Sequence, residues 1–524
     1  MSPNPTAMPI TDTAYDLHSD PPPLVPSEYQ AEIDALATEQ GCGPSDLVHL
    51  IDCVRAANAA DRQLPGALRQ ACTRLLALRS AQDSAVEFPA PEVAAAVARA
   101  RDALEPGPTF SLERADQAFA DAVASCRQAP PCAPATLASL LARQAAVAAL
   151  GQDHRRAADL YAAAAATPAL PVEAQWHYQC ERAAALEERG REYGDNAALE
   201  ESIELYSHAV LPLAPESERP DDWSVTQHRL GNALGIAGQR RRGVHYLERS
   251  IAAFEQALQG RSRERAPLDW AATQLGLGNA LGILAQRQGD DDMLRRAVAA
   301  FEGALQALRR DTAPREWAMA QYHLGTALLT LGQLKRDTAM LARSIDAYRQ
   351  VLRDWTRARA PLDWARVQNS LGTALRVRGE QGNDRVELEQ AIGAYRSALE
   401  VWTRARWPEE WSLAQNNLGA ALQRLGERQD DPAPLCEAIA AYDAALQEMR
   451  PDDRPIAWAM TRANLGDARR ALAERARDAD LCGQAICDFE AVAKVFREAS
   501  HPQYYDLAKE RLAVARKLAA ELGA

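Results

Sequence analysis

Lysine, aromatic residues and paired cysteines are scarce in this sequence. Of its 59 basic residues only four are lysines; genomic composition explains this bias more simply than a need for bidentate carboxylate contacts by arginine. The nine cysteines are scattered and form no CxxC pair, which indicates neither a zinc site nor a disulfide framework. We therefore expect a reducing, cytoplasmic environment and no bound metal.

Long hydrophobic runs and a basic leader are also lacking. No apolar stretch reaches the roughly 18 residues of a membrane-spanning helix, and the first residues carry proline and aspartate where a signal peptide has basic and apolar blocks. The net charge of −13 argues against a nucleic-acid ligand, because phosphate binding needs a basic surface. A hydrophobic fraction of 47% with 6% aromatic residues is typical of helices packed through alanine and leucine. The composition thus predicts an all-α protein that binds neither membrane nor nucleic acid.

A proline recurs every 47 residues from position 220 onward. The seven prolines are Pro220, Pro267, Pro314, Pro361, Pro408, Pro455 and Pro502. An aromatic residue stands three positions after each of them, namely Trp223, Trp270, Trp317, Trp364, Trp411, Trp458 and Tyr505. Self-similarity at a fixed period of this size predicts a solenoid, in which each unit packs on its neighbours.

Each repeat predicts two helices. The first begins at the proline, whose fixed φ suits the first helical turn, and carries an apolar stripe such as Trp411, Leu418 and Leu422. Gly419 follows the first of these leucines, and the equivalent glycines of the other repeats indicate that a second helix crosses closely there. The second helix carries a small-aromatic-small triplet around Tyr442. We therefore expect two helices to approach closely around one large ring.

The Leu-Gly pair followed by this triplet resembles the tetratricopeptide repeat (TPR), whose usual unit has about 34 residues. The longer form P-x-x-W-x-x-x-Q-x-x-L-G, with its 47-residue period, looks like the repeats of bacterial signalling and defence proteins. There the repeats accompany caspase-like (CHAT) protease or TIR domains. The resemblance covers residues 171–524 strongly and 91–170 weakly. It implies an all-α, right-handed α-solenoid of TPR-like helix pairs with a small N-terminal helical region.

Composition and repeat register predict four regions along the chain. Residues 1–27 are proline-rich and acidic and are expected to form a disordered arm, whereas residues 28–104 form a small helical region. Residues 105–170 carry degenerate repeats, and residues 171–524 carry the regular array, which a capping helix from about Tyr505 to Leu522 closes. The polar outer face of this cap is predicted from Lys509, Glu510, Arg511, Arg516 and Lys517.

Signatures of catalysis are lacking as well. The sequence contains no P-loop, GxSxG or HExxH motif and no CHAT-like or TIR-like catalytic segment. The best enzymatic candidates are His49 and Cys53, which stand four residues apart and so share a helix face. No third, orienting group is apparent, and an isolated helical cysteine is more often a small buried hydrophobe. We predict no enzyme activity, no catalytic residue and no cofactor.

One face of the first helices varies where the core does not. In the TPR family this face lines the concave groove that holds peptides, and the resemblance implies the same here. Asparagine amides match a peptide backbone, and arginines bind carboxylates in bidentate fashion; a merely solvated polar groove is the alternative. The predicted groove residues are His228, Asn232, Asn279, Tyr322, Asn369, Arg376, Asn416, Gln423, Arg424 and Arg470.

The sequence thus predicts a scaffold or adaptor that holds a peptide or partner domain in this groove. By resemblance it regulates a protease or other effector in bacterial signalling or defence. The alternatives are an enzyme with a catalytic domain within residues 28–104 and a helical-repeat RNA binder, which the acidic charge disfavours. Residues 1–54 contain nine acids and no lysine or arginine. This suggests the hypothesis that the arm occupies the groove until a partner displaces it, with a solvated tail as the alternative.

Overall fold

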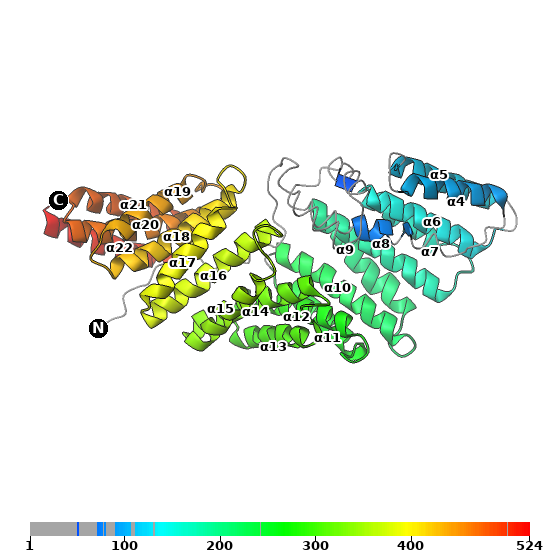
Figure 1. The fold of residues 1–524 in the computed structure, drawn as a ribbon, viewed down its shortest axis with the longest axis horizontal. Helices are drawn as coiled ribbons and strands as arrows, with labels where there is room; N and C mark the ends of the chain where they lie inside the picture. Colours follow the sequence, from blue (N-terminus) through cyan, green and yellow to red (C-terminus); the bar gives the residue numbers. More distant parts are fainter. Residues whose placement is uncertain are drawn as a thin grey trace. The chain divides into compact units, whose positions relative to one another are not determined.

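The structure, a computed structural model, describes residues 50–51, 71–76, 78–79, 90–105, 110–128, 132–241, 243–499 and 501–523. All regular secondary structure in these residues is helical (Figure 1). The chain divides into two compact units, an N-terminal unit that ends at Ala320 and a C-terminal unit that spans residues 321–524. The predicted arm, the candidates His49 and Cys53, and most of residues 28–89 lie outside the described residues.

The N-terminal unit is a series of helices that pack in consecutive pairs. Helix α9 (Asn196–Leu205) continues into a π-helical turn at Tyr206–Val210 and a 3₁₀ turn at Leu211–Leu213. The helices are α4 (Pro91–Leu104), α5 (Leu112–Gln128), α6 (Pro134–Leu150), α7 (His154–Ala165), α8 (Val172–Tyr193), α9 (Asn196–Leu205), α10 (Pro220–Arg240), α11 (His245–Gly260), α12 (Pro267–Gln288) and α13 (Asp291–Ala307).

The C-terminal unit continues the alternation of longer first helices and shorter second helices. The division between the units falls inside α14 (Pro314–Lys335). The remaining helices are α15 (Thr338–Val351), α16 (Pro361–Gly382), α17 (Arg385–Leu399), α18 (Pro408–Glu427), α19 (Ala433–Leu446), α20 (Pro455–Ala476), α21 (Ala479–Glu498) and α22 (Pro502–Leu522).

The helix boundaries follow from local sequence signals. A helix begins at each of the seven repeated prolines, as predicted. Several second helices begin after an aspartate, such as Asp290 and Asp384, whose carboxylate accepts hydrogen bonds from the free backbone N–H groups of the first turn. Gly289 and Asn383 end α12 and α16 in the left-handed conformation, which glycine and asparagine adopt most readily.

The core of each pair is a glycine on the first helix against an aromatic ring on the second. A Cβ atom added to Gly231 would lie 2.8 Å from the Phe254 ring, and one added to Gly419 would lie 2.8 Å from the Tyr442 ring. Both rings are almost fully buried. The predicted close approach around one large side chain is therefore confirmed in both units.

These contacts repeat from pair to pair and make an α-solenoid of TPR-like helix pairs. Second helices also pack on the next first helix, as α11 does on α12, α17 on α18 and α19 on α20. Successive first helices touch as well, as in α16 with α18. Because each pair covers the exposed apolar side of its neighbour, the array grows without one central core. The predicted all-α solenoid is confirmed.

The last helix, α22, differs from the predicted cap at one residue. Its outer face exposes Lys509, Glu510, Arg516 and Lys517, as expected of a terminal helix. Arg511, however, is only 5% exposed and forms an ion pair of 2.6 Å with Asp467 on α20. The prediction for Arg511 is wrong because its side chain points toward α20, the preceding first helix. The acid that it contacts there, Asp467, is absent from the equivalent positions of the earlier repeats.

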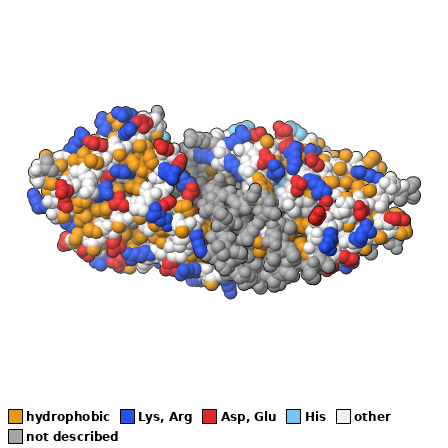
Figure 2. Space-filling view, turned by 90° about the horizontal axis from the view of Figure 1, so that it is seen from above, with side chains coloured by type: hydrophobic (Ala, Val, Ile, Leu, Met, Phe, Trp, Pro, Cys, Tyr) orange, Lys and Arg blue, Asp and Glu red, His pale blue; other side chains and the backbone are white. Residues whose placement is uncertain are grey.

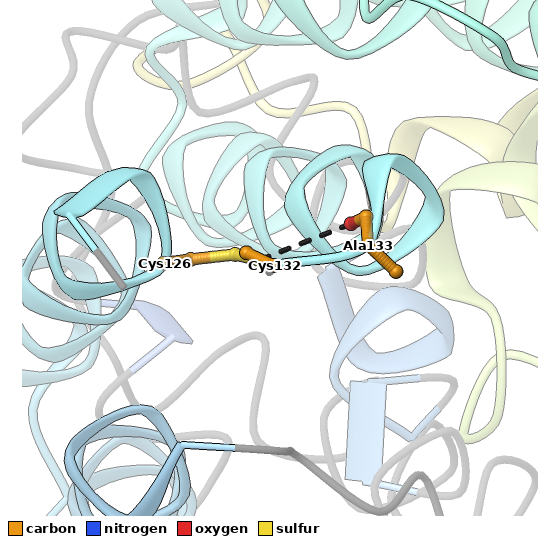
Figure 3. The surroundings of a disulfide bond; sticks show 3 residues. All are labelled: Cys126, Cys132 and Ala133. Carbon is orange, nitrogen blue, oxygen red and sulfur yellow. Dashed lines mark hydrogen bonds between the residues drawn. A yellow bond between two sulfur atoms is a disulfide. The ribbon is translucent and has the colours of Figure 1, made fainter. Parts of the chain in front are cut away.

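A disulfide joins Cys126, in the last turn of α5, to Cys132, just before α6 (Figure 3). The two Cα atoms are 5.4 Å apart, and six positions separate the residues in sequence. The expectation of no disulfide is thus wrong for this pair. Spacing did not reveal it because the pairing depends on how the connection between α5 and α6 brings two scattered cysteines together.

Candidate functional site

A row of polar side chains follows the first helices of the C-terminal unit. In each of four successive first helices, α16, α18, α20 and α22, a basic or amide side chain contacts a glutamate four residues later, on the same helix face. The pairs, here called the polar row, are Arg376–Glu380 at 2.7 Å, Gln423–Glu427 at 2.8 Å, Arg470–Glu474 at 3.5 Å and Lys517–Glu521 at 3.9 Å.

Contacts between neighbouring helices link the members of this row. Arg424 lies 2.7 Å from Glu427 on its own helix and 3.6 Å from Glu380 on α16. The Tyr442 hydroxyl on α19 donates to the Gln423 side-chain oxygen at 3.0 Å. The aromatic residue that fills the core therefore also orients a polar residue of the row.

Two of the predicted asparagines, Asn369 and Asn416, accept hydrogen bonds from the next repeat. The Asn417 amide donates to Asn369 Oδ1 at 3.1 Å, and the Asn464 amide donates to Asn416 Oδ1 at 3.4 Å. Asn369 and Asn416 are 5% and 2% exposed. Their Oδ1 atoms thus serve the contact between successive first helices, whereas the prediction assigned these side chains to a peptide backbone.

The three predicted arginines are largely covered. Their side chains are 12% (Arg376), 14% (Arg424) and 22% (Arg470) exposed. Burial by itself lowers the pKa of Arg376, but the Glu380 carboxylate and the Tyr395 hydroxyl outweigh it, so that the pKa is raised. The Arg376 guanidinium therefore stays charged, and a carboxylate from a partner must exchange with the glutamates already paired to these arginines.

One acid, Asp467, contacts arginines of two successive first helices near the C-terminal end of the row. Asp467 on α20 contacts Arg511 at 2.6 Å and Arg470 at 4.0 Å. Burial raises the pKa of Asp467, and the two arginines oppose this shift. Because Arg470 lies between Asp467 and Glu474, it can move from one carboxylate to the other without losing a charged partner.

His228 in the N-terminal unit has a different environment. Its Nδ1 lies 3.1 Å from the Thr273 hydroxyl, and its Nε2 lies 3.2 Å from the Asn232 amide nitrogen. The Thr273 hydroxyl already donates to the backbone carbonyl of Asp269, so the imidazole must donate from Nδ1 and accept at Nε2. Burial, with Arg261 and Arg229 nearby, lowers the pKa of His228 to about 3. His228 is thus a neutral, fully hydrogen-bonded side chain.

The predicted groove residues therefore fall into two groups. His228, Asn232 and Asn279 lie on α10 and α12 of the N-terminal unit, and Asn279 is partly buried there. The C-terminal unit holds Tyr322, whose ring lies 5.8 Å from that of Tyr348. It also holds the six others: Arg376, Gln423, Arg424 and Arg470 belong to the polar row or contact it, whereas Asn369 and Asn416 accept hydrogen bonds from Asn417 and Asn464.

Sequence reasoning missed the acidic half of the row. Glu380, Glu427 and Glu474 recur at the same 47-residue spacing as the prolines, and this register could have identified them. The amide donors Asn417 and Asn464 recur in the same way.

A second set of arginines, the carbonyl clamps, was also missed. Arg428 on α18 donates to the backbone carbonyls of Gly379 and Glu380, each at 3.1 Å, at the end of α16. Arg475 on α20 donates to the carbonyl of Gly426 at 2.9 Å, at the end of α18. The Gly379 carbonyl also accepts the backbone N–H groups of Asn383 and Asp384, and the Gly426 carbonyl accepts that of Gln429, so each arginine adds a further donor to a helix end. The clamps are Arg240, Arg287, Arg428 and Arg475, and the same register holds Leu334 and Gln381.

The described surface carries no large area of one charge on the face drawn in Figure 2, where basic and acidic side chains are interspersed. No described helix is long and apolar enough to cross a membrane. No group of three metal-binding side chains occurs among the described residues.

No family model and no curated protein matches the chain. Several solved structures resemble it. BtubC (BKLC) from P. vanneervenii matches with a TM-score of 0.34 and 19% identity, over 47% of this chain and 94% of that one. The C-terminal part of a TPR repeat-containing protein from Cytophaga hutchinsonii matches with a TM-score of 0.37 and 13% identity, over 62% and 98%. A tetratricopeptide repeat protein from Parabacteroides merdae gives 0.35 and 14%, over 64% and 100%. Likenesses at this level carry no functional argument.

Proposed function

We propose that the chain is a cytoplasmic interaction scaffold that binds an extended segment of a partner protein along the polar row. The observation that carries the proposal is the row itself, in which equivalent polar positions recur on four successive first helices. A partner in an extended conformation meets such positions one after another, so many weak contacts add along its length. By its resemblance to long TPR arrays, the scaffold serves bacterial signalling or defence and regulates a protease or another effector.

The pairing within the row sets the chemistry of the partner. Each basic group is already paired with a carboxylate, so a segment of one charge gains attraction at one member and meets repulsion at the next. A segment that carries both acidic and basic side chains can replace both members of a pair. We therefore propose a zwitterionic segment, whose carboxylates bind Arg376, Arg424 and Arg470 and whose amines bind Glu380 and Glu427.

The proposal is tested by panning a displayed random-peptide library against the full chain. Peptides enriched on the wild type should carry both charge signs and should bind the Arg424→Ala variant at least about tenfold more weakly, which corresponds to about 1.4 kcal/mol. Arg385→Ala is the matched control, because Arg385 is exposed on α17 and pairs only locally with Glu389. Peptides that bind both variants as they bind the wild type would contradict the proposal.

A further inference from the structure

Two neighbouring loops of the C-terminal unit share the sequence Trp-Thr-Arg-Ala-Arg. They span residues 355–359 and 402–406, and each leads into the proline that begins the next first helix. We call them the twin loops. The equivalent connections of the N-terminal unit read RSRERAP and RRDTAP and lack this motif.

The backbone holds both twin loops in the same turn. The Thr356 carbonyl accepts hydrogen bonds from the backbone N–H groups of Arg359 and Ala360, each at 3.0 Å. The Thr403 carbonyl accepts the equivalent bonds from Arg406 and Trp407, at 3.1 and 2.8 Å. A turn closed twice on one carbonyl is rigid, so the loop backbone needs little ordering when a ligand binds.

The arginines of the turns face solvent. Arg357 is 56% exposed and Arg404 is 51% exposed, and Arg359 and Arg406 are exposed as well. Trp402, at the start of the second loop, is only 5% exposed and anchors that loop in the core. The twin loops thus combine a fixed backbone with outward guanidinium groups.

The two loops lie side by side. Arg357 of the first loop forms an ion pair with Glu400, which stands two residues before the second loop. Arg404 of the second loop makes the equivalent contact with the segment after α19, where it lies 2.8 Å from Gln447 and 2.5 Å from Glu448. Two equal arrays of arginines therefore recur along one edge of the unit.

The twin loops keep free capacity to bind carboxylates. A guanidinium group has five N–H donors, and an exposed ion pair contributes only about 0–1 kcal/mol. The side chain of Arg359 makes no ion pair with any residue that the structure describes. The Arg404 guanidinium also lies 5.6 Å from the centre of the Trp411 ring, and arginine beside a tryptophan is a composition enriched in protein interfaces.

We propose that the twin loops bind an acidic segment of a partner protein, as a site separate from the polar row. Arginines at alternate positions on each turn can each hold one carboxylate in bidentate geometry. Charge complementarity with the exposed arginines of the two loops selects a ligand that carries carboxylates. Trp411 adds apolar contact beside Arg404, which a peptide side chain can use.

The test uses the full chain and a fluorescent oligo-glutamate peptide as the probe, with binding followed by anisotropy. The triple variant Arg357→Ser, Arg359→Ser, Arg404→Ser should raise the Kd for the probe by about tenfold or more, with unchanged thermal unfolding. The control triple variant Arg385→Ser, Arg497→Ser, Arg516→Ser has the same change in net charge on exposed residues elsewhere in the unit. It should change the Kd less than about twofold, because distant surface charges are screened by salt.

Two further comparisons separate this site from its alternatives. Arg424→Ala, in the polar row, should leave probe binding unchanged, whether or not that row binds a partner. Equal weakening by both triple variants, or no binding by the wild type, would overturn the proposal. An oligonucleotide that binds more tightly than the peptide and loses affinity in the twin-loop variant alone would overturn it in favour of a nucleic-acid site.

Discussion

The first helices of the two units have the same core and different polar faces. In the C-terminal unit the positions of the polar row hold Arg376 and Glu380, or their equivalents, whereas in the N-terminal unit they hold Gly282 and Gln286 on α12. The glycine that touches the aromatic ring is present in both units. The difference teaches that packing determines the repeat, while the polar face is free to specialise in one part of the array.

The ring also varies along the array. It is phenylalanine at positions 254 and 301 and, within the C-terminal unit, at Phe489, whereas in α15, α17 and α19 it is tyrosine. The Tyr442 hydroxyl reaches Gln423 and the Tyr395 hydroxyl donates to Thr373 Oγ1 at 3.1 Å. Tyrosine therefore fills the same core position as phenylalanine and adds a hydrogen bond to a polar side chain of the first helix.

The largest expected effect tests the shared core. Phe301→Ala and Tyr442→Ala should each lower the free energy of unfolding by about 3–5 kcal/mol, because each removes a buried ring. Tyr442→Phe should cost only about 1 kcal/mol, the contribution of its hydrogen bond to Gln423. Chemical denaturation measures all three. If Phe301→Ala had a much smaller effect than Tyr442→Ala, the two cores would not be equivalent.

A smaller effect is expected from the polar row. Arg376→Ala should lower the free energy of unfolding by about 1.5–3 kcal/mol, because it leaves the Glu380 carboxylate without its nearest partner. The exposed Arg385→Ala should change it by less than about 0.5 kcal/mol. Equal values for the two variants would mean that the row contributes nothing to folding.

The buried histidine gives the N-terminal unit a pH dependence. The folded-state pKa of His228 is about 3, below the ordinary 6.5, so between these values the unfolded state binds the extra proton and stability falls as the pH falls. Between about pH 6 and pH 4, wild type should lose about 1.4 kcal/mol per pH unit more than His228→Gln. Glu187, whose pKa burial raises to about 7, acts in the opposite direction but equally in both proteins. Parallel stability curves would contradict this expectation.

The smallest effect is expected at Gly282, which stands where the polar row has an arginine. Gly282→Ala should raise the free energy of unfolding by about 0.5–1 kcal/mol, because alanine favours the helix and the added Cβ meets no atom within 4 Å. Gly278→Ala on the same helix should instead be destabilising, since its Cβ would lie 2.6 Å from the Phe301 ring. Thermal unfolding of the two variants compares them directly. Destabilisation by both would show that Gly282 is needed for close packing.

Much of the fold could be predicted because its signals are local. Proline favours a helix start through its own φ, and a large ring requires a glycine opposite it. Pro361, Gly372 and Tyr395 were therefore enough to predict the helix pair α16–α17. Tryptophan was harder to place. Trp317 was assigned to the apolar stripe but is only partly buried, with the Arg310 guanidinium 5.7 Å from its ring centre.

The site was harder to predict because it depends on neighbours. A helical period tells which residues share a face, but it does not tell which element covers that face. Asn369 was assigned to an open groove, yet Asn417 of the next first helix covers it. The division of the chain at Ala320 likewise falls where the 47-residue spacing continues without interruption, so it left no mark in the register.

The carbonyl clamps have a consequence for the synthesis of the chain. Arg428 and Arg475 each satisfy a carbonyl group that was translated 49 residues earlier. At about 5–20 residues per second, the last turn of α16 waits about 2–10 s for its guanidinium donor. During that time the Gly379 carbonyl keeps its local backbone donors, Asn383 and Asp384, but lacks the guanidinium group. Each repeat therefore receives its last helix-end contact from its successor, and a nascent chain that stalls just before Arg428 leaves that contact unmade.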